Sequence, residues 1–166
     1  MDERIEMTMP MEMTLRFATP EDVAAMSEIW KEFMDFHADR EPLMTRSEEG
    51  DQEFEKHLLE LIADSDSFVL VAELDGELVG QCLATIFKRP PVFDNLEYGL
   101  IHDLAVKQRF RRKGIGERLF RETVEWFRAK GVDRIELRVV VANEVSTAFW
   151  RKMGFAAYME ILRLGI

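Results

Sequence analysis

The spacing of apolar residues in the first third of the chain predicts one strand and two helices. A weak alternation over 13–18 indicates a short strand. Residues 19–22 then combine a hydroxyl N-cap, a proline at the first helical position and two acids in the first turn, which predicts a helix to about His37. After a charged, irregular stretch, apolar residues at helical spacing predict a second helix; they are Phe54, Leu58, Leu61 and Ile62.

The middle of the chain predicts a β-hairpin followed by a loop. Two apolar runs, 68–74 and 78–87, flank Asp75 and Gly76, a dipeptide typical of two-residue hairpin turns. Prolines within 88–96 indicate the loop.

The last third of the chain predicts two strands around a helix. The apolar run 98–106 is rich enough to be buried on both faces of a sheet. An amphipathic helix is expected over 114–130, with Gly131 as its C-terminal stop. Clean alternation predicts the next strand over 134–141. A short helix and a last strand complete the pattern, over 143–153 and 155–164.

Length and composition favour one globular domain. The 166 residues are 47% hydrophobic, which is enough for one core, since single domains mostly run to about 100–150 residues. Residues 1–12 lack usable periodicity, so we expect a flexible leader over 1–12 and the folded domain over 13–166. No apolar run approaches the ~18 residues of a membrane span, and signal-peptide features are missing, so we expect a cytoplasmic protein without membrane contact.

Charge and metal-ligand patterns exclude several kinds of site. Thirty-two acids against 22 bases give a net charge of −10, which disfavours non-specific binding to nucleic acid. Cys82 is alone in an apolar strand pattern, so we expect a buried core residue rather than a nucleophile. The histidines, His37, His57 and His102, lack metal-ligand spacing, so we predict no metal site.

Residues 107–116 concentrate five basic residues and two glycines where a strand pattern gives way to a helix pattern. A helix start offers unpaired N–H groups and the positive end of the helix dipole, and glycine lets an anion approach closely. Neither a Walker loop nor a dinucleotide fingerprint fits, because the turn lacks Gly-Lys-Ser/Thr and Leu119 stands at the third glycine position. The segment therefore predicts an anion site. We favour the pyrophosphate of a cofactor over a solvated basic surface or a nucleic-acid patch.

The pattern R-x-x-G-x-G over 111–116, here called the glycine turn, directly follows a predicted strand. It resembles the acetyl-CoA pyrophosphate loop of the GNAT superfamily of N-acetyltransferases. Asn143, Ser146 and the sequence Phe-Trp-Arg-Lys-Met-Gly-Phe over 149–155 resemble the second signature of that family. The order of predicted elements also matches, so the resemblance covers roughly residues 13–164.

The resemblance implies a single domain of the α/β (α+β) class. Its mixed central sheet would have six to seven strands flanked by about four helices, in the order β-α-α-β-β-β-α-β-α-β. Acetyl-CoA would lie in a cleft where two central parallel strands splay apart, here 98–106 and 134–141.

The resemblance also assigns cofactor contacts to particular residues. Main-chain groups of the strand before the turn would bind the pantetheine arm, and an N–H near Leu104 would face the thioester oxygen. These strand residues are Leu104, Ala105 and Val106. The backbone of the turn would bind the pyrophosphate; its residues are Arg111, Arg112, Lys113, Gly114, Ile115 and Gly116. The second signature would contribute Asn143, Ser146 and Trp150.

Transfer of acetyl to an amine needs a base that accepts the amine proton. Many relatives read Ile-Glu-Asp-Leu before the turn, whereas this chain reads Ile-His-Asp-Leu over 101–104. An unperturbed histidine pKa of ~6.5 suits a base near neutral pH, so we predict that His102 acts directly or through water. A strand histidine that is merely hydrogen-bonded is the alternative. Asp103 is expected to face the other side of the strand and to be structural.

The acid that protonates the departing thiolate is less evident. Trp150 occupies the usual tyrosine position, and an indole is not a proton donor of this kind, so we expect it to pack against the cofactor or the core. Tyr98 and Tyr158 are substitutes, and water is another proton source. The predicted catalytic set is His102, Leu104 and Tyr98.

The function implied by the resemblance is transfer of acetyl from acetyl-CoA to a primary amine by direct attack in a ternary complex. The acceptor is a small molecule or a protein N-terminus, bound near the first two helices. A non-catalytic acyl-CoA-binding or sensor module of the same fold is the alternative, because Trp150 replaces the usual acid. Many relatives dimerise through their last strands, which leaves a homodimer open.

Overall fold

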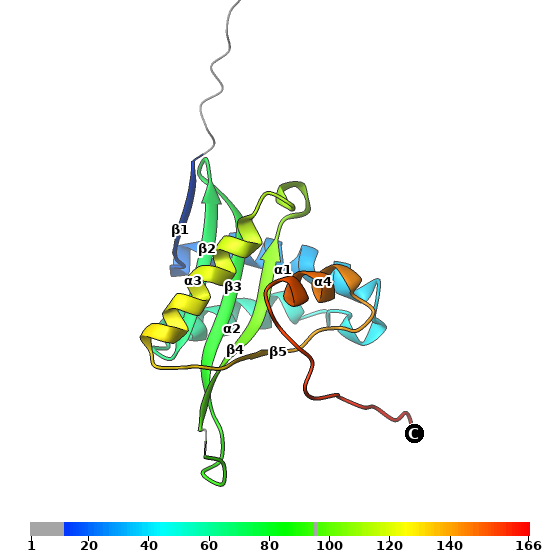
Figure 1. The fold of residues 1–166 in the computed structure, drawn as a ribbon. Coiled ribbons are helices and arrows are strands. Elements are labelled where there is room, and N and C mark those ends of the chain that lie inside the picture. Colours follow the sequence, from blue (N-terminus) through cyan, green and yellow to red (C-terminus); the bar gives the residue numbers. More distant parts are fainter. Residues whose placement is uncertain (1–11, 95) are drawn as a thin grey trace, which may run out of the picture.

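The computed structural model describes residues 12–94 and 96–166 (Figure 1). They form one mixed sheet of five strands in chain order. Strands β1 to β4 are antiparallel to their neighbours, and β4 and β5 are parallel, so the expected mixed sheet is confirmed. The strands are β1 (Met13–Phe17), β2 (Ser67–Leu74), β3 (Glu77–Lys88), β4 (Glu97–Val106) and β5 (Ile135–Leu137).

Helices cover both faces of the sheet. Figure 1 shows α1 and α2 on one face and α3 on the other. The α-helices are α1 (Val23–Ala38), α2 (Gly50–Ala63), α3 (Ile115–Ala129) and α4 (Glu144–Lys152). Short 3-10 helices are η1 (Pro20–Asp22), η2 (Pro42–Met44) and η3 (Gln108–Phe110). Within the described residues, no helix combines the length and apolar character needed to cross a membrane.

Two apolar cores fill the space between the sheet and its helices. The core on the α1/α2 side includes Met26, Ile29, Leu58, Val71 and Leu83. The core on the α3 side includes Ala72, Val79, Cys82, Leu119 and Phe127. Burying one large apolar side chain contributes roughly 1.5–3 kcal/mol, so both faces hold the sheet in place.

The predicted turns and helix ends are present. Asp75 and Gly76 have positive φ angles of 50° and 82°, as a tight hairpin turn requires. Gly131, with a φ of 78°, follows α3 as its predicted stop. At the predicted start of the first helix, the N–H of Thr19 donates to Asp22 Oδ2 at 2.8 Å.

The strand count is lower than expected. The strand predicted over 134–141 is only three residues long, and 155–164 is mostly exposed and forms no strand in the described chain. A strand requires a neighbour for its backbone hydrogen bonds, and in the described structure residues 155–164 do not pair with the open outer edge of β5. The leader predicted over 1–12 lies outside the described residues except for Glu12, so the domain boundary stays a prediction.

Close packing at Gly99 generates a stability prediction. A Cβ at this position would lie 2.5 Å from the ring of the buried Phe127, so Gly99→Ala should lower the free energy of unfolding by about 1–3 kcal/mol. Urea denaturation measures the change. The control is Gly50→Ala, where the nearest atom is 3.4 Å away and the loss should be much smaller. Gly99→Ala should lower the free energy of unfolding less in a Phe127→Leu background than in the wild type. Equal losses in both backgrounds would contradict the contact.

Candidate active site

Strands β4 and β5 separate beyond a short pairing, and we call the region between their diverging ends the cleft. Their last paired residues are Ile101 and Leu137. Beyond this point β4 continues to Val106 in pairing with β3 alone. The backbone edge of residues 104–106 therefore faces the cleft without a strand partner, as expected for two splayed central strands.

The glycine turn joins this strand edge to α3. Gly114 is the N-cap residue of α3 with a φ of 80°, and Arg112 has a φ of 60°. Glycine adopts such left-handed angles without steric cost. The first hydrogen bond of the helix returns from Arg118 N to Gly114 O at 3.0 Å, so the N–H groups just before Arg118 have no helical acceptor. The turn thus offers donors and a helix dipole to an anion.

Gly116 brings three elements together. A Cβ at this position would lie 3.4 Å from Leu104 Cδ2 and 3.6 Å from the ring of Phe149. Because glycine has no side chain, α3 starts directly beside the end of β4 and beside α4. The structure therefore brings the two predicted cofactor segments and the second signature to one place.

The basic residues before the turn are mostly engaged within the protein. Lys107 Nζ donates to Glu77 Oε1 at 2.8 Å, and Arg109 pairs with the same carboxylate. In the part of the chain that the structure describes, Arg112 and Lys113 form no ion pair, and both are exposed. Attraction of a polyanion therefore rests mainly on these two cations rather than on the whole basic segment.

Arg111 is turned inward and ties the turn to α1. Its Nε donates to Val106 O at 2.9 Å, and its guanidinium lies 4.9 Å from the ring centroid of Phe36. Glu32 of α1 lies 3.5 Å from Arg111 and accepts from Gln108 N at 2.5 Å. No pattern in the sequence indicates a role for Glu32, because this contact joins segments far apart in the chain.

An extra residue in β4 decides which side chains face α1 and α2. Leu83 of β3 pairs with Asp103, whereas Ala84 pairs with Ile101, which leaves His102 as the additional residue of a β-bulge. Opposite residues in a ladder share a face of the sheet. Asp103 therefore lies on the face of Leu83, which packs in the α1/α2 core.

His102 lies on the same face. Its Nε2 is 3.0 Å from Thr85 Oγ1, and Thr85 shares a face with Leu83, two residues earlier in β3. The ring centroid of His57 on α2 is 6.5 Å away. Although the side chain is partly open to solvent, desolvation by the surrounding protein, followed by the charges of His57 and Arg138, lowers the pKa of His102. The imidazole is therefore neutral near pH 7, as a base requires.

Asp103 shares this face, so the expectation that it points to the other side of the strand is wrong. That expectation assumed unbroken alternation along β4, which the bulge interrupts. Burial raises the pKa of Asp103 to about 6. An imidazole with a lowered pKa and a neighbouring carboxyl with a raised pKa thus face the α1/α2 side of the cleft.

Asn143 is buried and bonded at both ends of its amide. Its Oδ1 accepts from Ser146 N at 3.1 Å and caps α4, while its Nδ2 lies 3.2 Å from His37 Nε2. His37 is held in turn by Phe33 O, 2.8 Å from its Nδ1. The side chain predicted to bond the cofactor therefore joins α4 to α1, and the sequence provided no indication of its partner His37.

Trp150 packs in the core, one of its two expected locations. It is 8% exposed and makes edge contacts with Phe120 and Phe155, at centroid distances of 5.8 and 5.3 Å. The indole therefore fills the space between α3 and α4.

The two tyrosines are not brought to the end of β4. Tyr98 precedes Leu104 by six residues on the strand, which places it roughly 20 Å away at ~3.3 Å per residue. Its ring lies near Arg134, 5.5 Å from the guanidinium. The hydroxyl of Tyr158 lies 3.2 Å from Arg89, and its side chain is exposed. Neither tyrosine joins His102 in this structure.

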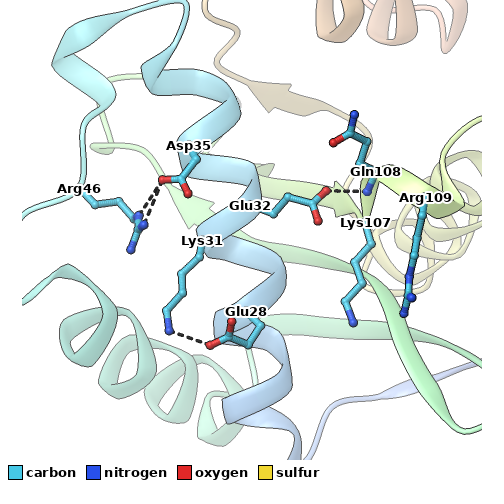
Figure 2. A pocket seen from close by; sticks show the side chains of 8 residues that line it. All are labelled: Glu28, Lys31, Glu32, Asp35, Arg46, Lys107, Gln108 and Arg109. Carbon is cyan, nitrogen blue, oxygen red and sulfur yellow. Dashed lines mark hydrogen bonds and ion pairs between the residues drawn. The ribbon is translucent and has the colours of Figure 1, made fainter.

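An open hollow of about 900 Å³ lies between α1 and the segment after β4 (Figure 2). Its charged groups pair with one another: Lys31 with Glu28 at 2.7 Å and Arg46 with Asp35 at 3.0 Å. The residues that line it do not include His102 or the glycine turn. We therefore assign the reacting atoms to the strand edge and not to this hollow.

Metal and thiol chemistry find no support in the described residues. Among residues 12–94 and 96–166, no three His, Cys, Asp or Glu side chains gather as metal ligands would. Cys82 is fully buried, and burial raises the pKa of its thiol to about 12. The thiol is therefore protonated at neutral pH and acts as a core side chain.

Comparison with known proteins agrees with this geometry. A model of the acetyltransferase (GNAT) family matches residues 25–155. The L-amino acid N-acetyltransferase AaaT of Escherichia coli is 34% identical over 90 residues, which cover 52% of this chain and 51% of that protein. This chain spans about half the length of the curated relatives it matches.

Solved structures share the fold along almost the whole chain. The BH1408 protein from Bacillus halodurans superposes with a TM-score of 0.81 at 23% identity, covering 92% of this chain and 99% of that chain. The aminoglycoside N-acetyltransferase AAC(6')-Iy, solved in complex with CoA, gives a TM-score of 0.75 at 15% identity and covers 96% of this chain and 97% of that chain. At these identities the likeness concerns the fold alone.

The raised pKa of Asp103 generates a pH-dependent stability prediction. The pKa of Asp103 is about 6 in the folded protein and about 3.9 in the unfolded chain. Its effect on the free energy of unfolding is therefore absent below about pH 3.9, and the destabilisation grows as pH rises to about 6. Asp103→Asn should therefore stabilise the protein by about 1–2 kcal/mol at pH 8 and by almost nothing at pH 4. Urea denaturation at several pH values measures this difference. The exposed Asp133→Asn serves as control; equal pH profiles for the two variants would contradict the prediction.

Proposed function

This chain belongs to the acetyltransferase (GNAT) family, and we propose that it transfers acetyl from acetyl-CoA to a primary amine by direct attack in a ternary complex. One observation carries the proposal: the edge of β4 that has no strand partner beyond its short pairing with β5 is joined to the glycine turn by the short helix η3, and the bulge residue His102 lies on the same strand. Donors for a long anionic cofactor and a neutral imidazole thus lie along one short stretch of backbone.

The residues present fit acetyl-CoA. The outward N–H groups of the glycine turn, with the exposed Arg112 and Lys113, suit the pyrophosphate. The backbone edge at 104–106 has no strand partner and suits the amides of the pantetheine arm, except at Val106 O, which accepts from Arg111 Nε. A backbone N–H at Leu104 would stabilise negative charge on the thioester oxygen. Acetyl-CoA supplies the activated acetyl group, and the chain supplies the position and the charge.

His102 is the proposed base. A neutral imidazole can take the proton from the attacking ammonium group, directly or through water, and leave the amine lone pair free for the carbonyl carbon. Trp150 is buried in the core, so water is the proposed proton source for the leaving thiolate. The position of Asp103 on the same face adds a carboxylate that attracts a cationic amine at neutral pH.

The proposal is compatible with two kinds of acceptor, a small amine and a protein N-terminus. The net charge of −10 favours cationic acceptors in general. The Escherichia coli relative carries the name of an L-amino acid N-acetyltransferase, and a relative from Sulfurisphaera tokodaii that of an N-alpha-acetyltransferase. We propose a small amine or a protein N-terminus as the acceptor, and the cytoplasm, where acetyl-CoA is available, as the compartment.

A non-catalytic acyl-CoA-binding module is the second candidate, and the burial of Trp150 away from any reacting position favours it. The two candidates differ in turnover. Both predict CoA binding, and only the enzyme predicts thiol release from acetyl-CoA in the presence of an amine.

Turnover and binding can be measured on the same variants. Across a panel of amines, His102→Gln should lower kcat about 10²–10⁴-fold and leave CoA affinity unchanged, because it removes only the base. Gly114→Val should weaken CoA binding, because a β-branched residue does not tolerate a φ of 80°. His57→Gln, a neighbouring histidine, is the control and should retain most activity.

The kcat/KM of the wild type should fall as pH decreases through a midpoint below 6.5, because the pKa of His102 is lowered. Tight CoA binding without acetylation of any amine would leave the sensor module as the function.

The C-terminal residues support a proposed homodimer. Ile161, Leu162 and Leu164 are 77%, 86% and 87% exposed, and the tail extends away from the body of the molecule (Figure 1). The outer edge of β5 has no strand partner in the described chain. We propose that the tail of one copy pairs with β5 of a second copy, which would supply the backbone hydrogen bonds that both segments lack.

Light scattering after size exclusion tests this pairing. The wild type should elute as a dimer, and a variant with Leu162→Lys and Leu164→Lys should elute as a monomer, because two charges cannot be buried in the interface. An Arg121→Lys variant, on the exposed face of α3, is the control. A wild-type monomer at about 100 μM would overturn the proposal.

A further inference from the structure

Four side chains form a continuous hydrogen-bonded chain that ends at His102. Ser67 Oγ donates to Asp64 Oδ2 at 2.6 Å, Ser67 Oγ and Thr85 Oγ1 are 3.2 Å apart, and Thr85 Oγ1 is 3.0 Å from His102 Nε2. The four residues come from the end of α2, the start of β2, the middle of β3 and the bulge of β4. Neither the cofactor site nor the acceptor site proposed above uses the first three.

The carboxylate of Asp64, at the end of the chain opposite His102, determines which group donates in each hydrogen bond. The Ser67 hydroxyl and then the N–H of Asp66 hold the pKa of Asp64 below its usual value, so this carboxylate is ionised and can only accept. Each hydroxyl has one proton to donate. Ser67 gives its proton to Asp64, so the 3.2 Å contact between Ser67 and Thr85 is a hydrogen bond only when Thr85 donates.

The same reasoning continues to the imidazole. Because the Thr85 proton points to Ser67, Thr85 Oγ1 can only accept from His102, and Nε2 of His102 must carry the hydrogen. A neutral imidazole then has its lone pair on Nδ1. The partner of one ring nitrogen thus defines the role of the other, as it does for the histidine of a Ser-His-Asp triad.

We propose that Thr85 and Ser67, directed by Asp64, are positioning residues that hold His102 in its Nε2–H tautomer, so that Nδ1 is the atom that accepts the amine proton. The proposal rests on the proposed function, in which His102 is the base. When Nδ1 takes the proton, its lone pair forms the new N–H bond and Nε2–H still donates to Thr85. Protonation therefore requires no rearrangement of the chain.

The other ionisable groups that face His102 leave this assignment intact. They are His57 on α2, Arg138 after β5 and Asp103 beside it on β4. None of them is a hydrogen-bond partner of the His102 ring in the described structure. The charges of His57 and Arg138 help to lower the pKa of the ring, whereas the hydroxyl chain decides which nitrogen titrates.

NMR of the histidine rings tests the tautomer without any assay of activity. Long-range proton–nitrogen correlation of the full chain near pH 8 distinguishes the two neutral tautomers, and a His102→Gln spectrum identifies the His102 signals. The wild type should show the Nε2–H form alone. Thr85→Val, which removes the hydroxyl but keeps the shape, should show a mixture, and Thr85→Ser should restore the wild-type pattern. An Nδ1–H ring in the wild type, or a Thr85→Val spectrum equal to that of the wild type, would overturn the proposal.

Kinetics then separates positioning from general stability. Thr85→Val should lower kcat about tenfold through a misoriented ring, with an unchanged KM for acetyl-CoA, and Thr85→Ser should recover most of the loss. Asp64→Asn should have a smaller effect in the same direction, because an amide can also donate and no longer imposes one direction. Thermal unfolding of each variant verifies the fold. If the wild type acetylates no amine, the proposed function fails, while the tautomer assignment is still decided by the NMR spectra.

Discussion

The backbone hydrogen bonding of β4 is the constraint on which the site depends. On one side the strand pairs with β3 along its length, and on the other it pairs with β5 only as far as Ile101. The polar groups beyond that residue must find partners in water, side chains or a ligand. The glycine turn follows after the short helix η3 and adds the N–H groups at the start of α3. The site therefore combines two groups of backbone donors and acceptors, one at the edge of β4 and one at the start of α3.

The bulge places two ionisable side chains on one face of the sheet, close to this strand edge. Without the extra residue, strict alternation would place His102 and Asp103 on opposite faces of the sheet. With it, both ionisable groups lie on the side of α1 and α2, at the cost of burying part of a carboxylate. The neighbouring strands supply the hydroxyl groups that orient the imidazole. The bulge in β4 thus places His102 on this face, and the pairing of β2 with β3 brings the two hydroxyl groups next to it.

Turns and helix ends could be predicted from the local sequence, whereas features that depend on contacts between distant segments could not. The Asp75-Gly76 turn, the glycine turn and the helix stop at Gly131 follow from backbone preferences of single residues, and the structure has them. The bulge at His102 depends on pairing with β3, which no local pattern reveals. The partnership of Asn143 with His37 joins residues 106 positions apart, so the sequence offered only the two residue types. The last strand was predicted from its pattern alone, whereas in the structure this segment does not pair with the open outer edge of β5.

The bond between Asn143 and His37 restricts the relative movement of two helices that are far apart in the sequence. It connects α4 to α1 across the end of the sheet, and both residues are buried. Helices joined in this way cannot swing apart without exposing and breaking a buried hydrogen bond, which costs roughly 1–3 kcal/mol. The bond therefore limits how far the start of α4 can move away from α1.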